Sequence, residues 1–171
     1  MKKRIVILIL IVAVIGYMCS SFTLVKQHDR ANTYRLPKSI ITHVTDETIG
    51  MNEEQIIDYS LSLTAQKLEF SIKNNIANGE ANCVGYAQLC AAICNEALRN
   101  NGYKNRAKCV VGYVKCCGVN LCNVAKCLGS NPKYKAFVKD HDFVELTVNG
   151  KTYYFDPSFY DVLGSKCLTV K

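Results

Sequence analysis

Residues 141–156, HDFVELTVNGKTYYFD, carry the strongest local fold signal in this chain. Two runs rich in aromatic and β-branched residues flank the pair Asn149-Gly150. An Asn-Gly pair in this position favours the type I′ turn of a two-residue β-hairpin. The sequence therefore predicts two antiparallel strands, in which Val148 faces Lys151 across the turn.

The predicted hairpin register brings an acid and a base together. Counting back from the turn places Asp156 opposite Phe143. His141 is two residues from Phe143, so it projects from the same face as Asp156 and is its diagonal neighbour. The Cβ atoms of diagonal neighbours lie about 7 Å apart or somewhat less. An aspartate that accepts from one ring nitrogen would orient His141 to take a proton with the other.

A helix is predicted upstream of the hairpin, with Asn82 as its N-cap and a stop at Asn101-Gly102. Cys83 then lies in the first helical turn. Unpaired backbone N–H groups and the helix dipole favour negative charge there, which populates the reactive thiolate. The backbone N–H of Cys83 is also a candidate oxyanion donor. The apolar face of this helix includes Val84, Ala87, Ala91 and Leu98.

The remaining patterns give the element order. A helix is predicted to begin near Asn52, a short strand covers residues 68–72, and residues 74–81 form a loop. A β-rich run at residues 108–114 is followed by an insertion-like loop over residues 115–139. Helices followed by an antiparallel sheet indicate an α+β fold, with the helices packed on one side of the sheet.

Four short motifs together resemble a known family. They are NCVGYA at residues 82–87, Arg106 leading into VVGYV at 110–114, HDFVE at 141–145 and YFDP at 154–157. Their order and intervals are similar to those of the transglutaminase-like superfamily, and the resemblance covers roughly residues 52–164. It implies a papain-like core in which a helix carrying Cys83 packs on an antiparallel sheet.

The resemblance also implies a catalytic triad of Cys83, His141 and Asp156. The cysteine would attack a carboxamide or peptide carbonyl, form a thioester, and release the acyl group to water or an amine. This chain has Phe143 where the family usually has a tryptophan two residues after its histidine. The loop of four cysteines before His141 is not a general family feature, and no second oxyanion donor is identified upstream of Cys83.

The first 25 residues predict export. Lys2, Lys3 and Arg4 supply three of the formal net charges of +7 and precede an uncharged, mostly aliphatic run at residues 5–25. Such a segment fits a cleaved signal peptide and an uncleaved membrane signal-anchor equally well, with lipidation at Cys19 as a third option. Residues 26–50 are expected to be a linker or N-terminal arm, and residues 51–171 the transglutaminase-like domain. The rest of the chain is then extracytoplasmic, in the cell envelope or secreted.

Ten cysteines in 171 residues suit an oxidising compartment. If Cys83 is a free nucleophile, eight cysteines remain outside the leader. We expect Cys90 and Cys94 to pack in the core or to form disulfides, because no histidine accompanies them at metal-ligand spacing. Disulfides are favoured over a zinc site in the loop over residues 115–139. The loop cysteines are Cys116, Cys117, Cys122 and Cys127.

The sequence thus favours an extracytoplasmic transglutaminase-like cysteine enzyme that needs no cofactor or metal. Its expected substrate is a peptide or protein amide, and hydrolysis is favoured because water is the default acceptor. The N-terminal segment is the expected membrane contact. No basic stripe with interleaved aromatic residues indicates a nucleic-acid partner. The alternatives are an inactive envelope module that binds a ligand in the same cleft, and a metal or redox protein built on the cysteine-rich loop.

Overall fold

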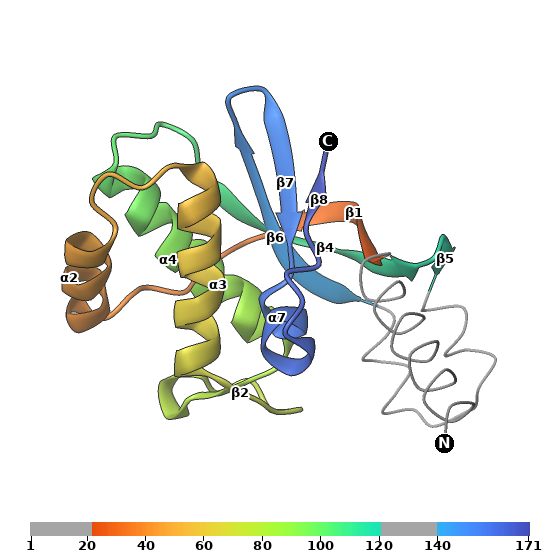
Figure 1. Ribbon diagram of the computed structural model, residues 1–171. Coiled ribbons are helices and arrows are strands. Elements are labelled where there is room, and N and C mark those ends of the chain that lie inside the picture. The colour runs from red at the N-terminus through yellow and green to blue at the C-terminus, as the bar shows by residue number, and fades with distance from the viewer. Residues whose placement is uncertain (1–21, 121–139) are drawn as a thin grey trace, which may run out of the picture.

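The computed structural model describes residues 22–120 and 140–171. Within these ranges the chain has a mixed α+β fold, with a curved antiparallel sheet and helices beside it (Figure 1). The elements are β1 (Phe22–Arg30), α2 (Lys38–Glu47), α3 (Glu53–Lys67), β2 (Glu69–Phe70), a 3-10 helix η1 (Ile76–Asn78), β3 (Glu80–Ala81), α4 (Cys83–Asn100), β4 (Ala107–Cys116), β5 (Val119–Asn120), β6 (His141–Val148), β7 (Lys151–Phe155), α7 (Pro157–Leu163) and β8 (Thr169–Val170).

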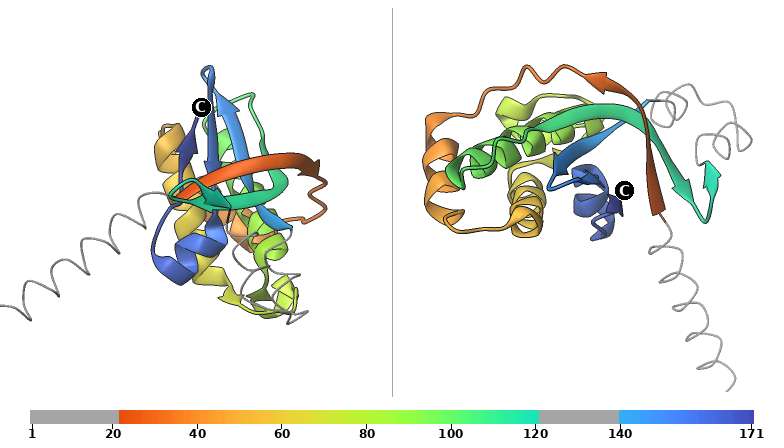
Figure 2. Two further views of the ribbon diagram at one scale, coloured as in Figure 1. Left: turned by 90° about the vertical axis from the view of Figure 1, so that its right-hand side faces the viewer. Right: turned by 90° about the horizontal axis from the view of Figure 1, so that it is seen from above.

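The main sheet has the strand order β1-β4-β6-β7-β8, and β5 pairs with β4. All of these pairs are antiparallel. The sheet curves strongly (Figure 2). As a result its two outer strands approach each other, and the backbone N–H of Leu24 in β1 donates to Thr169 Oγ1 of β8 at 3.0 Å.

Each face of the sheet has its own hydrophobic cluster, because successive side chains of a strand point to opposite faces. Cys109, Val144 and Phe155 join the larger cluster, in which α4 packs on the sheet and α3 packs on α4. Val110 and Phe143 belong to the smaller cluster on the other face, together with Leu24, Val114, Tyr154 and Cys167. The prediction that helices pack on one side of an antiparallel sheet is therefore confirmed for α4, which α3 covers in turn.

The predicted hairpin is confirmed residue by residue. Strands β6 and β7 are antiparallel, and Val148 faces Lys151. Asn149 and Gly150 have φ angles of 51° and 76°. Positive φ at both central positions is the requirement of a type I′ turn. The Asn-Gly pair therefore sets the register between β6 and β7.

Both predicted helix starts are also confirmed. Asn52 forms a capping box with Gln55, in which each side chain accepts a hydrogen bond from the backbone N–H of the other at 3.0 Å. Asn82 caps α4 by accepting from the backbone N–H of Val84 at 3.1 Å. The strand predicted over residues 68–72 shortens to β2, which pairs in parallel with β3.

Residues 26–50 differ from the irregular linker that the sequence indicates. They contain most of β1 and all of α2. Strand β1 buries only Leu24, yet it pairs with β4 along its length, apart from a register shift between Lys26 and His28. Helix α2 buries only Val44. Long-range backbone pairing, which leaves little trace in the local hydrophobic pattern, orders this segment.

The predicted leader lies almost wholly outside the described residues, although residues 22–25 of its apolar run belong to β1. Most of the cysteine-rich loop also lies outside them, including Cys122 and Cys127, so their disulfides stay a prediction, whereas Cys117 is a free, exposed thiol. In residues 22–120 and 140–171, the helices are too short or too polar to cross a membrane.

Three core cysteines pack as apolar side chains. Cys90, Cys94 and Cys109 are fully buried free thiols. Burial raises the pKa of Cys94 and of Cys109 to about 12, which keeps both thiols protonated and unreactive at neutral pH. Of the two alternatives for Cys90 and Cys94, the structure has core packing.

Replacement of Gly112 by alanine should destabilise the fold. Gly112 lies in β4 opposite His141, and a Cβ there would overlap the carbonyl oxygen of Val25 and approach Phe143 Cε1 to 3.0 Å. Because β1 backbone would have to move, we expect Gly112→Ala to lower the free energy of unfolding by about 1–3 kcal/mol. Urea denaturation measures this, with the exposed β4 variant Lys108→Ala as control. Equal midpoints for both variants would contradict the close approach of β1.

Candidate active site

Cys83 is the first residue of α4 and is 6% exposed. The capping residue before it is extended, with φ −93° and ψ −174°, so the chain turns into the helix at this cysteine. Cys83 therefore lies in the first turn of an 18-residue helix, where backbone N–H groups lack intrahelical partners, as the sequence predicts. Gly85 allows this packing, because a Cβ there would overlap the Asn74 side chain and lie 2.7 Å from Ala81 Cβ.

His141 and Asp156 meet as the hairpin register predicts. His141 Nε2 contacts Asp156 Oδ2 in a hydrogen-bonded ion pair. The histidine is 5% exposed and the aspartate is fully buried, so water does not compete for this contact. The contact joins the first residue of β6 to the residue that follows β7.

The other oxygen of the Asp156 carboxylate caps α7. Oδ1 accepts from the backbone N–H groups of Ser158 at 3.0 Å and Phe159 at 3.1 Å, and from the Ser158 hydroxyl at 2.7 Å. Each carboxylate oxygen thus has its own partners: the helix start holds one and the imidazole holds the other. Sequence reasoning did not single out Ser158 and Phe159. The signal that could have found them is Asp-Pro before an apolar run, which marks an N-cap followed by proline at the first helical position.

The Cys83 side chain interacts with the His141 ring closely enough to raise the pKa of the imidazole. Because Asp156 engages Nε2, the nitrogen left for the thiol is Nδ1. All three residues proposed from the sequence therefore form one chain of contacts, from sulfur through imidazole to carboxylate. They come from the start of α4, the start of β6 and the end of β7.

The neighbours of His141 favour its protonated form. Burial lowers the pKa of His141, but the charge of Asp156, its hydrogen bond and the contact with Cys83 outweigh burial and raise the pKa to about 10. The imidazole is then cationic at neutral pH. A buried cation therefore lies beside the Cys83 side chain.

Aromatic side chains hold the His141 ring in place. The ring of Phe143 is stacked at 6.4 Å between centroids, and the ring of Phe159 meets it edge-on at 5.5 Å. Phe143 is fully buried and also packs edge-on against Tyr154. The position where the resembled family has tryptophan is therefore filled here by a core phenylalanine.

Two further polar residues near the triad have structural partners. The Tyr86 hydroxyl lies 2.5 Å from Asp161 Oδ2 in α7 and 3.2 Å from the backbone carbonyl oxygen of Leu68. Burial and then the contact with Asp161 raise the pKa of Tyr86. Glu145 accepts from Lys26 Nζ of β1 at 2.9 Å. These contacts join separate elements, and neither residue touches the reacting groups.

Asp142 is a buried charge that sequence reasoning missed. Strand alternation turns it to the face opposite His141, where it is fully buried and forms an ion pair with Arg30 of β1. Burial raises the pKa of Asp142, and the Arg30 guanidinium opposes that rise. The pair fastens β1 across β4 to the start of β6, one residue from the histidine.

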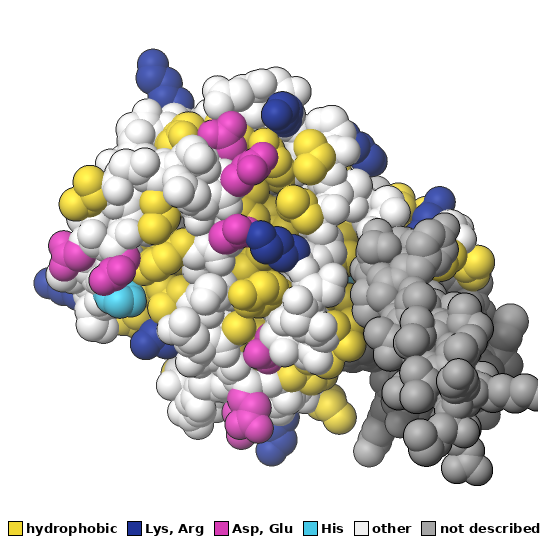
Figure 3. Space-filling model, in the orientation of Figure 1, with side chains coloured by type: hydrophobic (Ala, Val, Ile, Leu, Met, Phe, Trp, Pro, Cys, Tyr) yellow, Lys and Arg dark blue, Asp and Glu magenta, His cyan; other side chains and the backbone are white. Residues whose placement is uncertain are grey.

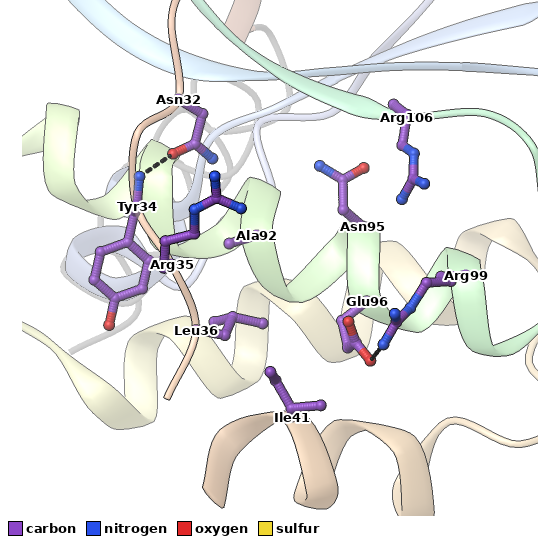
Figure 4. Close-up of a pocket in the computed structure, with 10 residues that line it drawn as sticks. All are labelled: Asn32, Tyr34, Arg35, Leu36, Ile41, Ala92, Asn95, Glu96, Arg99 and Arg106. Carbon is purple, nitrogen blue, oxygen red and sulfur yellow. Dashed lines mark hydrogen bonds and ion pairs between the residues drawn. The ribbon is translucent and has the colours of Figure 1, made fainter. Parts of the chain in front are cut away.

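A cavity of about 410 Å³ lies away from the triad, between α2, residues 32–36, α4 and the start of β4 (Figure 4). Three arginines line it. Arg99 is paired with Glu96, whereas Arg35 and Arg106 have no ion-pair partner among the described residues. The charge suits an anion, but the lining contains no cysteine, histidine or aspartate. The triad is therefore the better candidate for covalent chemistry.

In the part of the chain that the structure describes, no group of three or more histidine, cysteine, aspartate or glutamate side chains is placed to hold a metal ion. The alternative metal site depends on Cys122 and Cys127, which lie outside the described residues.

No protein-family model matches this chain, and no curated protein matches it in sequence.

The contribution of His141 to stability should depend on pH in a defined direction. Its folded pKa, about 10, is above the ordinary value of 6.5, so the stabilisation is fully present below pH 6.5 and is lost as the pH rises through about 10. The difference in unfolding free energy between wild type and His141→Gln should therefore be largest near pH 6 and shrink toward pH 10. Urea denaturation across this range measures it.

The matched control is His43→Gln, which replaces an exposed histidine of α2. Its unfolding curves should follow wild type at every pH. A difference between wild type and His141→Gln that stays constant from pH 6 to pH 10 would contradict the charged pair with Asp156.

Proposed function

We propose that this protein is an extracytoplasmic cysteine enzyme of the transglutaminase-like type that cleaves a peptide or side-chain amide through a thioester. The observation that carries the proposal is the continuous contact from Cys83 through His141 to Asp156. They are also the three residues to which the resemblance assigns the roles of nucleophile, base and orienting carboxylate. The same constellation of nucleophile, base and orienting carboxylate activates cysteines and serines on unrelated folds.

In the first half of the reaction, the Cys83 thiolate attacks the amide carbonyl carbon and a carbon–sulfur bond forms. The backbone N–H of Cys83 is the oxyanion donor that we propose for the tetrahedral intermediate. His141 then gives the Nδ1 proton to the leaving nitrogen as the carbon–nitrogen bond breaks. An amine departs, and a thioester and a neutral imidazole remain.

In the second half, the neutral imidazole of His141 takes a proton from water as the water oxygen attacks the thioester. The carbon–sulfur bond breaks, a carboxylic acid leaves, and the thiolate and imidazolium are restored. Throughout, Asp156 keeps the ring oriented and stabilises its cationic form. Water is the acceptor that we propose, and an amine in its place would give transamidation.

The papain-like core is part of this proposal. Its support is the packing of α4, which carries the cysteine at its N-terminus, against a sheet whose neighbouring strands β6 and β7 supply the histidine and the aspartate. The placement outside the cytoplasm rests on the sequence of residues 1–25, which also suggests the membrane as a partner.

Selective alkylation tests the proposed nucleophile. At pH 6.5 an ordinary thiol, with a pKa of about 8.5, is almost entirely protonated, so iodoacetamide should label Cys83 first. The exposed Cys117 is the internal comparison. We expect His141→Ala to slow labelling of Cys83 by on the order of 10²-fold, since the base and cation are lost. Peptide mapping by mass spectrometry gives the rate at each cysteine, and equal slow labelling of Cys83 and Cys117 in wild type would refute the proposal.

Two variants of Asp156 separate its two roles. Asparagine is also a good N-cap, so Asp156→Asn should keep the α7 start while it removes the charge beside His141. We expect labelling of Cys83 to fall by on the order of tenfold or more in this variant. Asp156→Ala should lose the cap as well, at a further cost of about 1 kcal/mol of unfolding free energy.

Iodoacetamide kinetics and urea denaturation of the same samples measure both effects. Labelling of Asp156→Asn at the wild-type rate would show that the carboxylate does not orient the imidazole.

A further inference from the structure

We propose that the acyl donor carries a large apolar side chain next to the attacked carbonyl, and that this side chain binds in a cavity between β2 and α7. We call it the α7 cavity. It has a volume of about 180 Å³ and is lined by Phe70, Ser158, Phe159, Val162 and Leu163. This inference rests on the proposed function, because it assigns a substrate class to that same site.

One wall of the α7 cavity is built from residues that touch the triad. Ser158 binds the Asp156 carboxylate through both its backbone N–H and its hydroxyl. The ring of Phe159 lies edge-on to the His141 ring, 5.5 Å between centroids. A ligand that contacts Phe159 is therefore one aromatic ring away from the imidazole that would protonate the leaving group.

The opposite wall adjoins the helix that carries the nucleophile. Phe70 of β2 pairs with Ala81 of β3, two residues before Cys83. Its ring also packs against Tyr86, one helical turn after Cys83, at 6.2 Å between centroids. The α7 cavity is thus lined by one residue that packs on the helix of Cys83 and by another that packs on His141, which makes it the apolar cavity that we assign to the acyl group.

The chemistry of the lining selects an apolar occupant. Four of the five lining side chains are hydrophobic, and the Ser158 hydroxyl already donates to Asp156. A charged side chain would lose its hydration there with no partner in exchange. A cavity of about 150 Å³ is enough for a benzene-sized group, so leucine or phenylalanine fits this one.

The rim of the α7 cavity leaves apolar surface in water. Val162 and Leu163 are 59% and 51% exposed. Figure 3 shows hydrophobic side chains at the surface around α7. A substrate side chain that enters the cavity would cover part of this surface, which adds to the driving force for binding.

Three chloromethyl ketones that differ only in the side chain next to the ketone test the inference. They are the N-acetyl derivatives of leucine, glycine and aspartate, each of which alkylates a reactive cysteine. We expect the rate constant for modification of Cys83 to be about 10- to 100-fold higher with the leucine probe than with the glycine probe. The aspartate probe should react no faster than the glycine probe. Intact-protein mass spectrometry with peptide mapping gives each rate.

The ratio of leucine to glycine rates should fall toward one in Val162→Asp, which brings a charge to the cavity rim. Val162→Ser is the milder second variant and should lower the ratio in the same direction. Ile49→Asp is the matched control, because Ile49 is a 77% exposed apolar residue outside the cavity. That variant should keep the wild-type ratio.

Iodoacetamide, which has no side chain to bind, separates the two proposals. If it does not label Cys83 preferentially in wild type, the proposed enzyme fails and the cavity inference fails with it. If it does, but the leucine and glycine probes react equally or the ratio survives both Val162 variants, only the cavity inference is overturned.

Discussion

The Asp156 carboxylate is the contact on which the rest of the site depends. One oxygen holds the first turn of α7, and the other holds the His141 ring. Because both oxygens are engaged inside a water-excluded region, the carboxylate has no freedom to rotate away from the imidazole. The orientation of the ring, the direction in which the chain leaves β7 and the position of Phe159 beside the ring all follow from this single buried group.

The rest of the fold brings the thiol to that fixed pair. Helix α4 packs on the sheet with its N-terminus toward the start of β6, so the sulfur of Cys83 reaches the nitrogen that Asp156 leaves open. Local rules position each group separately, through a cap for the cysteine and a turn for the acid and base. Tertiary packing brings the helix start and the hairpin together. The buried environment then strengthens the electrostatic interactions between the groups.

Short-range chemistry made much of this arrangement predictable. The turn at Asn149-Gly150 and the cap at Asn82 act on neighbouring backbone, so their effects can be read from a few residues. Strand β1 could not be found in this way, because its hydrogen bonds go to β4 and its side chains are mostly polar. Ser158 was missed for a different reason. Its role depends on Asp156 acting both as a helix cap and as the partner of His141, and the sequence interpretation considered only the second.

Tyr86 gives the α7 cavity a fixed width. Its hydroxyl is bound to Asp161 of α7 and lies beside the Leu68 carbonyl, immediately before β2, so one phenol bridges the elements that form the two walls. Such a pocket is pre-organised: its walls do not need to be ordered when a ligand arrives, and little conformational entropy is lost on binding. It also adapts poorly, so a group too bulky for the gap is rejected on shape, whatever its hydrophobicity.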